Sequence, residues 1–294
     1  MRKIVSLLAF VAIMITFAAC NNGGNEPESE IVINPNSMKG MMPGRFTVDD
    51  KGTQVRFSQG NLQYNAQRGE NGTWRFATHQ WDTIGQANAN ISETYDGWID
   101  LFGFGTGTNP TLAISGNSNY HASDEWGENI IANGGNNTGL WRTLTHDEWV
   151  YLFHGRNNAE ILFGFGSVAG VNGVILLPDN WDNPMEVPGF KASTTKGLTW
   201  KGDSYKNNYS NYPHNTYSAE QWDIMEQAGA VFLPAAGYRN NSKQCNYVGT
   251  YGEYWSSTPG GDEDIAYYIN YAATSLVLQN CSNKCYGRSV RLVR

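Results

Sequence analysis

Turn-forming residues interrupt every apolar run in the body of this chain. The 294 residues include 33 Gly and 10 Pro, and neither type is favoured in the interior of a long helix. No repeat with a period of roughly 20 to 50 residues is visible, so coiled coils and long solenoids are poor fits. Aromatic residues make up 13% of the chain, which supplies apolar area for a core and excludes bulk disorder. The sequence therefore predicts short elements joined by long connections.

Two places carry the signature of a helix N-terminus. Thr145 is followed three residues later by Glu148, so each side chain can bond to the other residue's backbone amide. Ser218 and Gln221 repeat this arrangement, and Gly229 is placed to end the second helix. An apolar residue directly before each cap is spaced to pack on a tryptophan inside the helix. The sequence therefore predicts two helices.

Elsewhere, short apolar or aromatic runs alternate with clusters of Gly, Asn and Ser. Two helices among many short strands indicate an α+β domain with small antiparallel sheets and extensive loops, and we predict one domain over residues 45–294. Leu-Phe-Gly-Phe-Gly occurs at 101–105 and at 162–166, and we interpret both copies as turns with buried Phe. The predicted strands are Gln54–Phe57, Asn61–Tyr64, Thr73–Ala77, Gly173–Leu177, Ala230–Leu233, Glu253–Ser257, Ile265–Tyr271, Ser275–Leu278 and Ser289–Val293.

The first 44 residues differ in composition from the rest. A basic start precedes an apolar run, Ile4–Phe17, that is too short to span a bilayer comfortably, and small residues lead up to Cys20. The pattern resembles a bacterial lipoprotein signal, which implies a signal peptide at 1–19 and lipid attachment at Cys20. Residues 20–44 then form a flexible acidic tether. We expect an exported lipoprotein, attached to the outer membrane or cell surface of a Gram-negative bacterium by its acyl chains.

Three further cysteines lie within the last fifty residues. An exported compartment permits disulfides, and a tight turn would let Cys281 reach Cys285. Unpaired thiols at Cys245, Cys281 and Cys285 are equally compatible with the sequence. A metal site is disfavoured because no histidine follows His214 to supply a fourth ligand.

Motifs that carry catalysis are missing from the sequence. Neither Gly-x-Ser-x-Gly nor His-Glu-x-x-His occurs, and the glycine-rich run at 103–108 lacks the lysine of a phosphate-binding loop. The acidic run 262–264 could hold calcium, but a solvated turn is the simpler interpretation. The net charge of −7 argues against a nucleic-acid partner. We expect no enzyme activity, no cofactor and no metal.

The strongest functional signal lies in the tail, residues 238–294. This segment carries eight of the 16 tyrosines, where its length alone predicts about three, together with six asparagines. Tyrosine offers rigid, amphipathic contact area at little rotamer cost, and Asn and Ser add hydrogen bonds, as in adaptable recognition surfaces. Tyrosines that merely pack a β core would give the same count. The tyrosines are Tyr238, Tyr247, Tyr251, Tyr254, Tyr267, Tyr268, Tyr271 and Tyr286.

Four segments resemble, in chain order, the landmarks of the C-type lectin-like fold in its bacterial branch. They are Trp141–Trp149, Phe232–Arg239, Tyr254–Thr258 and Gly287–Val293. That branch includes the formylglycine-generating enzyme superfamily, a paralogous group of surface lipoproteins with a Tyr-Trp-Ser-Ser-Thr signature, and the variable proteins of diversity-generating retroelements. The resemblance covers residues 45–294 and implies a C-type lectin-like domain.

Within this branch, the enzymes are the weaker comparison. Cys281 and Cys285 stand directly before the closing Gly-Arg-Ser-Val-Arg segment, which is the wrong place for the groove cysteines of the oxygen-dependent enzymes. The retroelement-diversified proteins resemble the chain in their lipoprotein start, their lectin-like body and their Ser-Val-Arg-Leu-Val-like end. Their fixed fold displays variable side chains for ligand capture, in several cases at a phage tail fibre or pilus tip. The sequence leaves open whether this tail is diversified or fixed.

We therefore predict a cell-surface ligand-binding or adhesion lipoprotein with an unknown protein or glycan ligand, and with pilus or other surface proteins as further partners. A structural or pilus-associated subunit and an enzyme of the formylglycine-generating type are the alternatives. The predicted ligand-binding residues are Asn240, Asn241, Ser242, Asn246, Tyr247, Asp262, Asp264, Asn270, Tyr271, Asn280, Ser282, Asn283, Tyr286 and Arg288.

Overall fold

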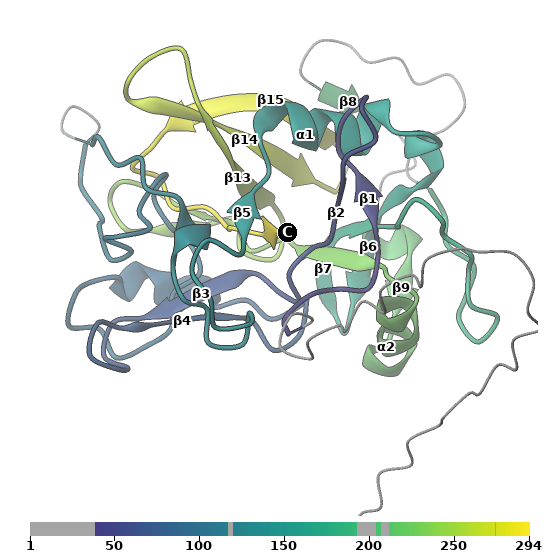
Figure 1. Cartoon of the computed structure of the whole chain (residues 1–294), viewed down its shortest axis with the longest axis horizontal. Helices are drawn as coiled ribbons and strands as arrows, with labels where there is room; N and C mark the ends of the chain where they lie inside the picture. Colours follow the sequence, from purple (N-terminus) through teal and green to yellow (C-terminus); the bar gives the residue numbers. More distant parts are fainter. Residues whose placement is uncertain (1–38, 117–119, 193–203, 207–211, 274) are drawn as a thin grey trace, which may run out of the picture. The chain divides into compact units, whose positions relative to one another are not determined.

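The computed structural model describes residues 39–116, 120–192, 204–206, 212–273 and 275–294 (Figure 1). The predicted signal peptide, Cys20 and most of the predicted tether lie outside these residues. Small sheets and short helices form a mixed α+β architecture, as predicted. None of the helices in the described ranges has the length and apolar character needed to cross a membrane.

Two four-stranded sheets organise the fold. The first has the order β13-β14-β15-β8 and is antiparallel throughout, and the second has the order β10-β7-β6-β9 with a parallel β6–β9 pair. Their strands are β13 (Gly252–Pro259), β14 (Ile265–Ala272), β15 (Ser275–Asn283), β8 (Ser204–Lys206), β10 (Val231–Pro234), β7 (Val171–Leu176), β6 (Phe163–Val168) and β9 (Thr216–Tyr217).

Four two-stranded sheets and several short helices complete the chain. The paired strands are β1 (Phe46–Thr47) with β2 (Gln54–Val55), β3 (Leu62–Asn65) with β4 (Thr73–Phe76), β5 (Arg142–Thr143) with β16 (Leu292–Val293), and β11 (Tyr238–Arg239) with β12 (Cys245–Asn246). The helical segments are η2 (Gly85–Asn90), η3 (Trp126–Glu128), α1 (His146–Val150), the π-helical turn η4 (Tyr151–Gly155), η5 (Ala159–Ile161), η6 (Tyr212–His214) and α2 (Ala219–Gln227).

An apolar core lies against each face of both sheets. Successive side chains of a strand point to opposite sides and so enter different cores. In β13, Tyr254 enters a central core between the two sheets, whereas Trp255 enters an outer core that also holds Ala266 and Tyr268 of β14. In β10, Phe232 enters a third core, which it shares with Trp222 of α2. The fold is therefore a stack of three apolar cores separated by two sheets.

A register shift in β15 decides which of its residues face which core. Leu276 lies opposite Tyr271 and faces the central core, whereas Asn280 lies opposite Tyr268 of the outer core. The irregularity falls between the pairs formed by Tyr268 and Asn270, and an extra residue of this kind moves the following side chains to the other face. The polar end of β15 thus shares a face with Tyr268.

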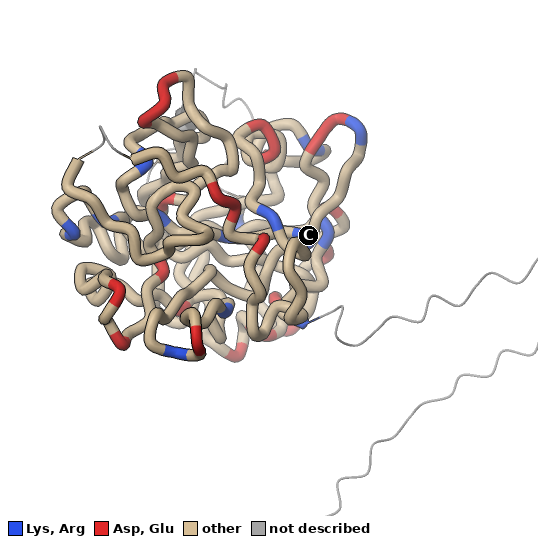
Figure 2. Tube along the Cα trace, turned by 60° about the vertical axis from the view of Figure 1, so that its left-hand side comes forward, with Lys and Arg blue, Asp and Glu red and all other residues tan. Residues whose placement is uncertain are grey.

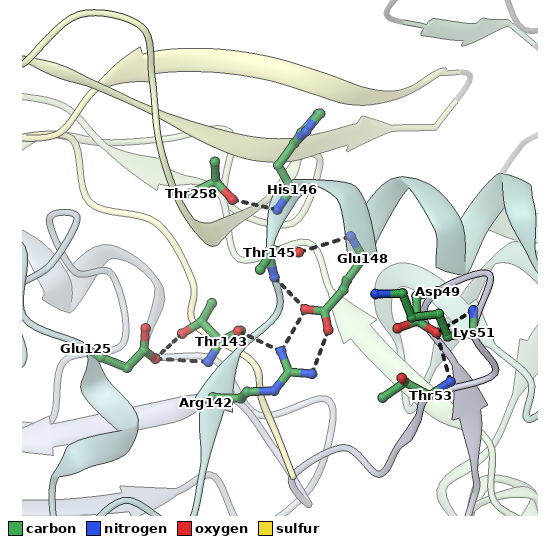
Figure 3. A network of polar contacts seen from close by, with 10 residues as sticks. All are labelled: Asp49, Lys51, Thr53, Glu125, Arg142, Thr143, Thr145, His146, Glu148 and Thr258. Carbon is green, nitrogen blue, oxygen red and sulfur yellow. Dashed lines mark hydrogen bonds and ion pairs between the residues drawn. The ribbon is translucent and has the colours of Figure 1, made fainter.

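Both predicted helix starts are confirmed, and each is a complete capping box. At α1, the Glu148 carboxylate accepts a hydrogen bond from the Thr145 amide at 2.8 Å and two from the Arg142 guanidinium, each at 2.6 Å (Figure 3). The amide of His146 donates to Thr258 Oγ1 at 2.9 Å, which ties the helix to β13. A separate turn in the same view is closed by Asp49, whose carboxylate accepts from two backbone amides.

Each of the nine predicted strands coincides with an observed strand or its flanking bridge, with shifted ends. The interpretation of 162–166 as a turn was wrong, because Phe163 begins β6. The glycines of β6 lie where a side chain would collide with neighbouring groups: a Cβ at Gly166 would come within 2.7 Å of an Ile175 methyl. Phe163 and Phe165 alternate with these glycines and fill the central core, so the pattern is that of a strand with one crowded face.

The start and the end of the described domain pair with each other. The amide of Arg56 donates to the carbonyl of Arg294 at 2.8 Å, and the amide of Arg294 returns a bond to Arg56 at 3.0 Å. Phe57 and Val293 form a bridge beside them, and both side chains are fully buried in the central core. The described residues between 39 and 294 belong to one compact unit.

Candidate functional site

Four tyrosines of the tail form a continuous series of ring contacts, which we call the tyrosine row. The ring centroids of Tyr286 and Tyr238 lie 6.0 Å apart with planes 15° from parallel, and those of Tyr247 and Tyr251 lie 4.4 Å apart at 16°. Tyr238 joins the two pairs through a 6.1 Å contact with Tyr247. Tyr247 is 54% exposed, and the other three rings are half-buried. The row therefore presents aromatic surface to solvent.

The row is held by backbone geometry as well as by ring contacts. Tyr238 lies in β11 and pairs with Asn246 of β12, which places Tyr247 directly after the paired strand. Tyr247 has a left-handed φ of +55°, which is uncommon for a residue with a bulky side chain. Its carbonyl accepts from the Tyr251 amide at 3.0 Å and from Thr250 Oγ1 at 2.9 Å. This turn keeps the last two rings of the row stacked.

The loop between β11 and β12 carries three of the predicted binding residues, and a fourth, Asn246, lies in β12. Asn240 Oδ1 accepts from the amides of Ser242 and Gln244, both at 2.9 Å, and so fixes the loop from within. Ser242 is exposed, and Asn241 and Asn246 are half-buried. The structure thus places these predicted residues in the same hairpin as Tyr238, beside the tyrosine row.

A buried ion pair underlies the row. Arg288 Nε donates to Glu253 Oε2 at 2.7 Å, and the side chains are 2% and 6% exposed. Asn270 Nδ2 donates to the second Glu253 oxygen at 3.1 Å. The guanidinium carbon of Arg288 lies 3.7 Å from the ring centroid of Tyr268 and 5.6 Å from that of Tyr286. The expectation that Arg288 contacts ligand at the surface is wrong, since its side chain supports the row from beneath.

The protonation state of Tyr238 follows from this arrangement. Burial raises the pKa of the Tyr238 phenol, and the nearby Glu253 carboxylate raises it further. A neutral phenol both donates and accepts hydrogen bonds. Tyr238 therefore keeps both capacities at neutral pH.

Tyr271 was expected at the binding surface, and that expectation is also wrong. Its ring is fully buried in the central core, 6.3 Å from the ring of Tyr254, and its hydroxyl donates to the carbonyl of Leu233. Burial raises the pKa of the Tyr271 phenol well above its usual range. The physical cause is that the end of β14 is covered by β10, so Tyr271 has no free face.

The remaining predicted residues lie at the end of the first sheet. Asp262 is exposed in the turn between β13 and β14, and the carbonyl of Asp264 accepts from the Lys284 amide at 2.9 Å. Asn280 and Ser282 lie on the Tyr268 face of β15. The carbonyl of Asn283 accepts from the Tyr286 amide at 3.1 Å, which connects this group to the row.

The three cysteines of the described chain are free thiols. Cys281 is exposed on β15, whereas Cys285 is buried, so this structure takes the unpaired alternative. Burial raises the pKa of the Cys285 thiol. Across the described ranges, no group of three or more His, Cys, Asp or Glu side chains could hold a metal ion.

Three residues of this surface were not selected from the sequence. Tyr238 and Tyr251 contribute two of the four rings, and Glu253 supplies the buried carboxylate. The tyrosines were visible as part of the tail composition, but nothing local distinguished them from those of the core. Glu253 was not detectable as a partner of Arg288, because 35 residues separate them in sequence.

Charge is spread thinly over the rest of the trace. Figure 2 shows acidic and basic residues interspersed among a majority of uncharged positions. The tyrosine row and its loop match this pattern, since they consist mainly of Tyr, Asn and Ser. This surface therefore offers mainly aromatic area and neutral hydrogen-bonding groups.

One family model matches the chain, over residues 200–293, and it describes a domain of unknown function (DUF8237). The matched part is about a third of the chain and includes the whole tyrosine row and the first sheet. No curated protein and no solved structure matches the chain.

Proposed function

We propose that this protein is an exported, lipid-anchored surface protein that captures a protein or glycan ligand with its tyrosine row and performs no reaction on it. The observation that carries the proposal is the row itself: four part-exposed rings in contact, three from the segment 238–251 and Tyr286 from the chain after β15. A monomeric protein normally exposes large aromatic rings singly, and clustered ones mark interaction surfaces.

The rigidity of the row supports a binding role. Association costs free energy for each side chain that becomes ordered, so a surface that is already ordered loses less on binding. The rings are held by one another, by the Tyr247 turn, and by the Arg288–Glu253 pair beneath them. Tyrosine adds little rotamer entropy to this cost because it has only two side-chain torsions.

The anchor and the finer fold belong to the same proposal. The basic and apolar start followed by Cys20 supports lipid attachment, and residues 20–44 supply the tether. The C-type lectin-like fold is supported by where the four resembling segments lie. Trp141–Trp149 includes β5 and most of α1, and Phe232–Arg239 includes most of β10 and all of β11. Tyr254–Thr258 lies in β13, and Gly287–Val293 includes the closing strand β16.

The test is a binding screen of the purified protein against a glycan array and against intact cells. The double variant Tyr238→Ala/Tyr286→Ala should lower the affinity for any ligand found in the screen at least about 30-fold, because truncating an aromatic hot spot costs roughly 2 kcal/mol of binding free energy. Tyr151→Ala is the matched control, since Tyr151 is a half-buried tyrosine outside the row. Both variants should melt within a few degrees of the parent.

Binding that survives the double variant would place the recognition surface elsewhere. A row that serves assembly gives a different result: the double variant then loses cross-links to other surface proteins on intact cells, while binding to the array is absent in the parent as well.

A further inference from the structure

A pocket of about 610 Å³ opens beside the β3–β4 hairpin, in a part of the chain that the tyrosine row does not use. Arg68 and Arg75 line it together with the ring of Trp98, and the exposed residues Ala132 and Thr78 add apolar and hydroxyl surface. Pockets that bind small molecules have volumes of roughly 300 to 1,000 Å³ and combine apolar walls with a few polar groups. The volume and the lining fit this description.

Two cations share one aromatic ring in this pocket. The guanidinium carbon of Arg75 lies 3.6 Å from the Trp98 ring centroid, and that of Arg68 lies 5.4 Å from it. Burial lowers the pKa of the Arg75 guanidinium, and the positive charge of Arg68 lowers it further. Two like charges in one pocket repel each other, and a ligand anion would relieve that repulsion.

The charges of these arginines are not neutralised by an adjacent carboxylate. Among the described residues, neither guanidinium takes part in an ion pair. Asp82 acts on Arg75 only as a charge at longer range. The net charge of the chain is −7, so carboxylates outnumber basic side chains. These two arginines nevertheless lie side by side without a carboxylate bound to either.

The hydrogen-bonding capacity of the pair is only partly used. Arg75 Nε donates to Gln63 Oε1 at 2.8 Å, which fixes the plane of the guanidinium and leaves its two terminal nitrogens. Arg68 lies in the turn between β3 and β4, where its carbonyl accepts from Thr73 Oγ1 at 2.8 Å, and its side chain is exposed. Planar guanidinium groups match the geometry of carboxylate, sulfate and phosphate oxygens.

We propose that this pocket binds a small organic ligand through an oxyanion, with Arg68 and Arg75 contacting the anionic group and Trp98 and Ala132 contacting the ligand's carbon skeleton. The mixed lining favours a compact ring that carries hydroxyl groups, which is the chemistry of an acidic or phosphorylated sugar. The site is independent of the tyrosine row, because the two share no residue.

The experiment is a titration calorimetry series on the full chain with four probes: glucuronate, glucose 6-phosphate, inorganic phosphate and neutral glucose. Saturable binding of at least one anionic probe and none of glucose is expected. The probe that binds most tightly identifies the anionic group that the pocket prefers. Tighter binding of glucuronate or glucose 6-phosphate than of inorganic phosphate shows that the sugar ring contributes to the affinity.

Arg68→Gln and Arg75→Gln should each weaken that binding about tenfold or more, because each removes a charge-assisted contact. Arg45→Gln removes an equally exposed positive charge outside the pocket and should leave the binding unchanged. Arg68 makes no side-chain hydrogen bond within the described chain, so its variant keeps the parent fold and the test stays decisive. The proposal is overturned if no anion saturates by about 10 mM, which corresponds to roughly −2.7 kcal/mol, if glucose binds equally well, or if Arg68→Gln binds as the parent does.

Discussion

The tail holds two populations of tyrosine that composition cannot distinguish. Tyr254 and Tyr271 lie in the central core with their hydroxyls bonded to the backbone of β10, whereas Tyr238 and Tyr247 lie in the tyrosine row with rings open to solvent. Both populations come from the same short segment. The difference teaches that the position of a tyrosine in the paired strands, rather than its residue type, decides whether its ring is buried in the core or open to solvent.

The boundary between the two populations is the buried ion pair. Glu253 and Arg288 lie on the sheet face that also holds Trp255 and Tyr268, and Tyr286 of the row lies directly above Arg288. Substitutions on either side of this boundary should therefore act on different quantities: on the free energy of unfolding below it, and on ligand affinity above it.

The largest effect is expected in the core population. Tyr271→Ala should lower the free energy of unfolding by about 4 kcal/mol, because removing a buried aromatic ring leaves a cavity. Tyr271→Phe keeps the ring and should cost about 1 to 2 kcal/mol, since the carbonyl of Leu233 loses its donor. Denaturant unfolding measures both values. A loss below about 1 kcal/mol for the alanine variant would contradict the buried position of Tyr271.

The boundary itself should give the next largest effect. Glu253→Gln should cost about 3 kcal/mol, because it leaves the Arg288 charge buried without a counter-charge. The amide can still accept from Asn270, so the loss comes mainly from the ion pair. Thermal melting checks the change, and Asp262→Asn, in an exposed turn, is the control that should stay near the parent. An unchanged melting temperature for Glu253→Gln would show that the pair is not needed beneath the row.

The smallest effect is a dependence on alkaline pH. Burial raises the pKa of Tyr254 and Tyr271 above the ordinary tyrosine value of about 10. Both phenols stay neutral in the fold and ionise in the unfolded chain, so their contribution is fully present below about pH 10 and is lost as the pH rises further. The free energy of unfolding should fall above that pH by up to about 1.4 kcal/mol per unit for each phenol. Unfolding curves from about pH 9 to 11 test the slope, which Tyr271→Phe should reduce; an equal slope in this variant would argue against a neutral buried Tyr271.

The local features of the fold could be predicted from the sequence because their causes are local. A capping box needs only a hydroxyl residue and Glu or Gln three positions later, and both predicted boxes form, at Thr145 and Ser218. Gly229 adopts a φ of +102° after α2, as expected of a residue that ends a helix. These interactions involve neighbours along the chain, so the sequence contains them in full.

The misplaced residues depend on partners far away in sequence. Gly164 and Gly166 suggest a turn by themselves, and only the pairing of β6 with β7 makes them strand residues. Tyr271 is buried because β10 covers it, and Arg288 because it reaches Glu253. The segment from Asn240 to Tyr247 forms a polar hairpin whose turn residues are fixed by local hydrogen bonds, and its predicted role in binding stays a prediction.

The mutual hydrogen bonds of Arg56 and Arg294 join two segments that lie far apart in sequence. Phe57 reaches its final environment only when Val293 lies beside it, and more than 200 residues separate the two in sequence. Contacts between such distant positions form late, because the whole intervening segment must first be available. The segment around Phe57 therefore acquires its backbone partners only after the rest of the described domain, up to Val293, is available.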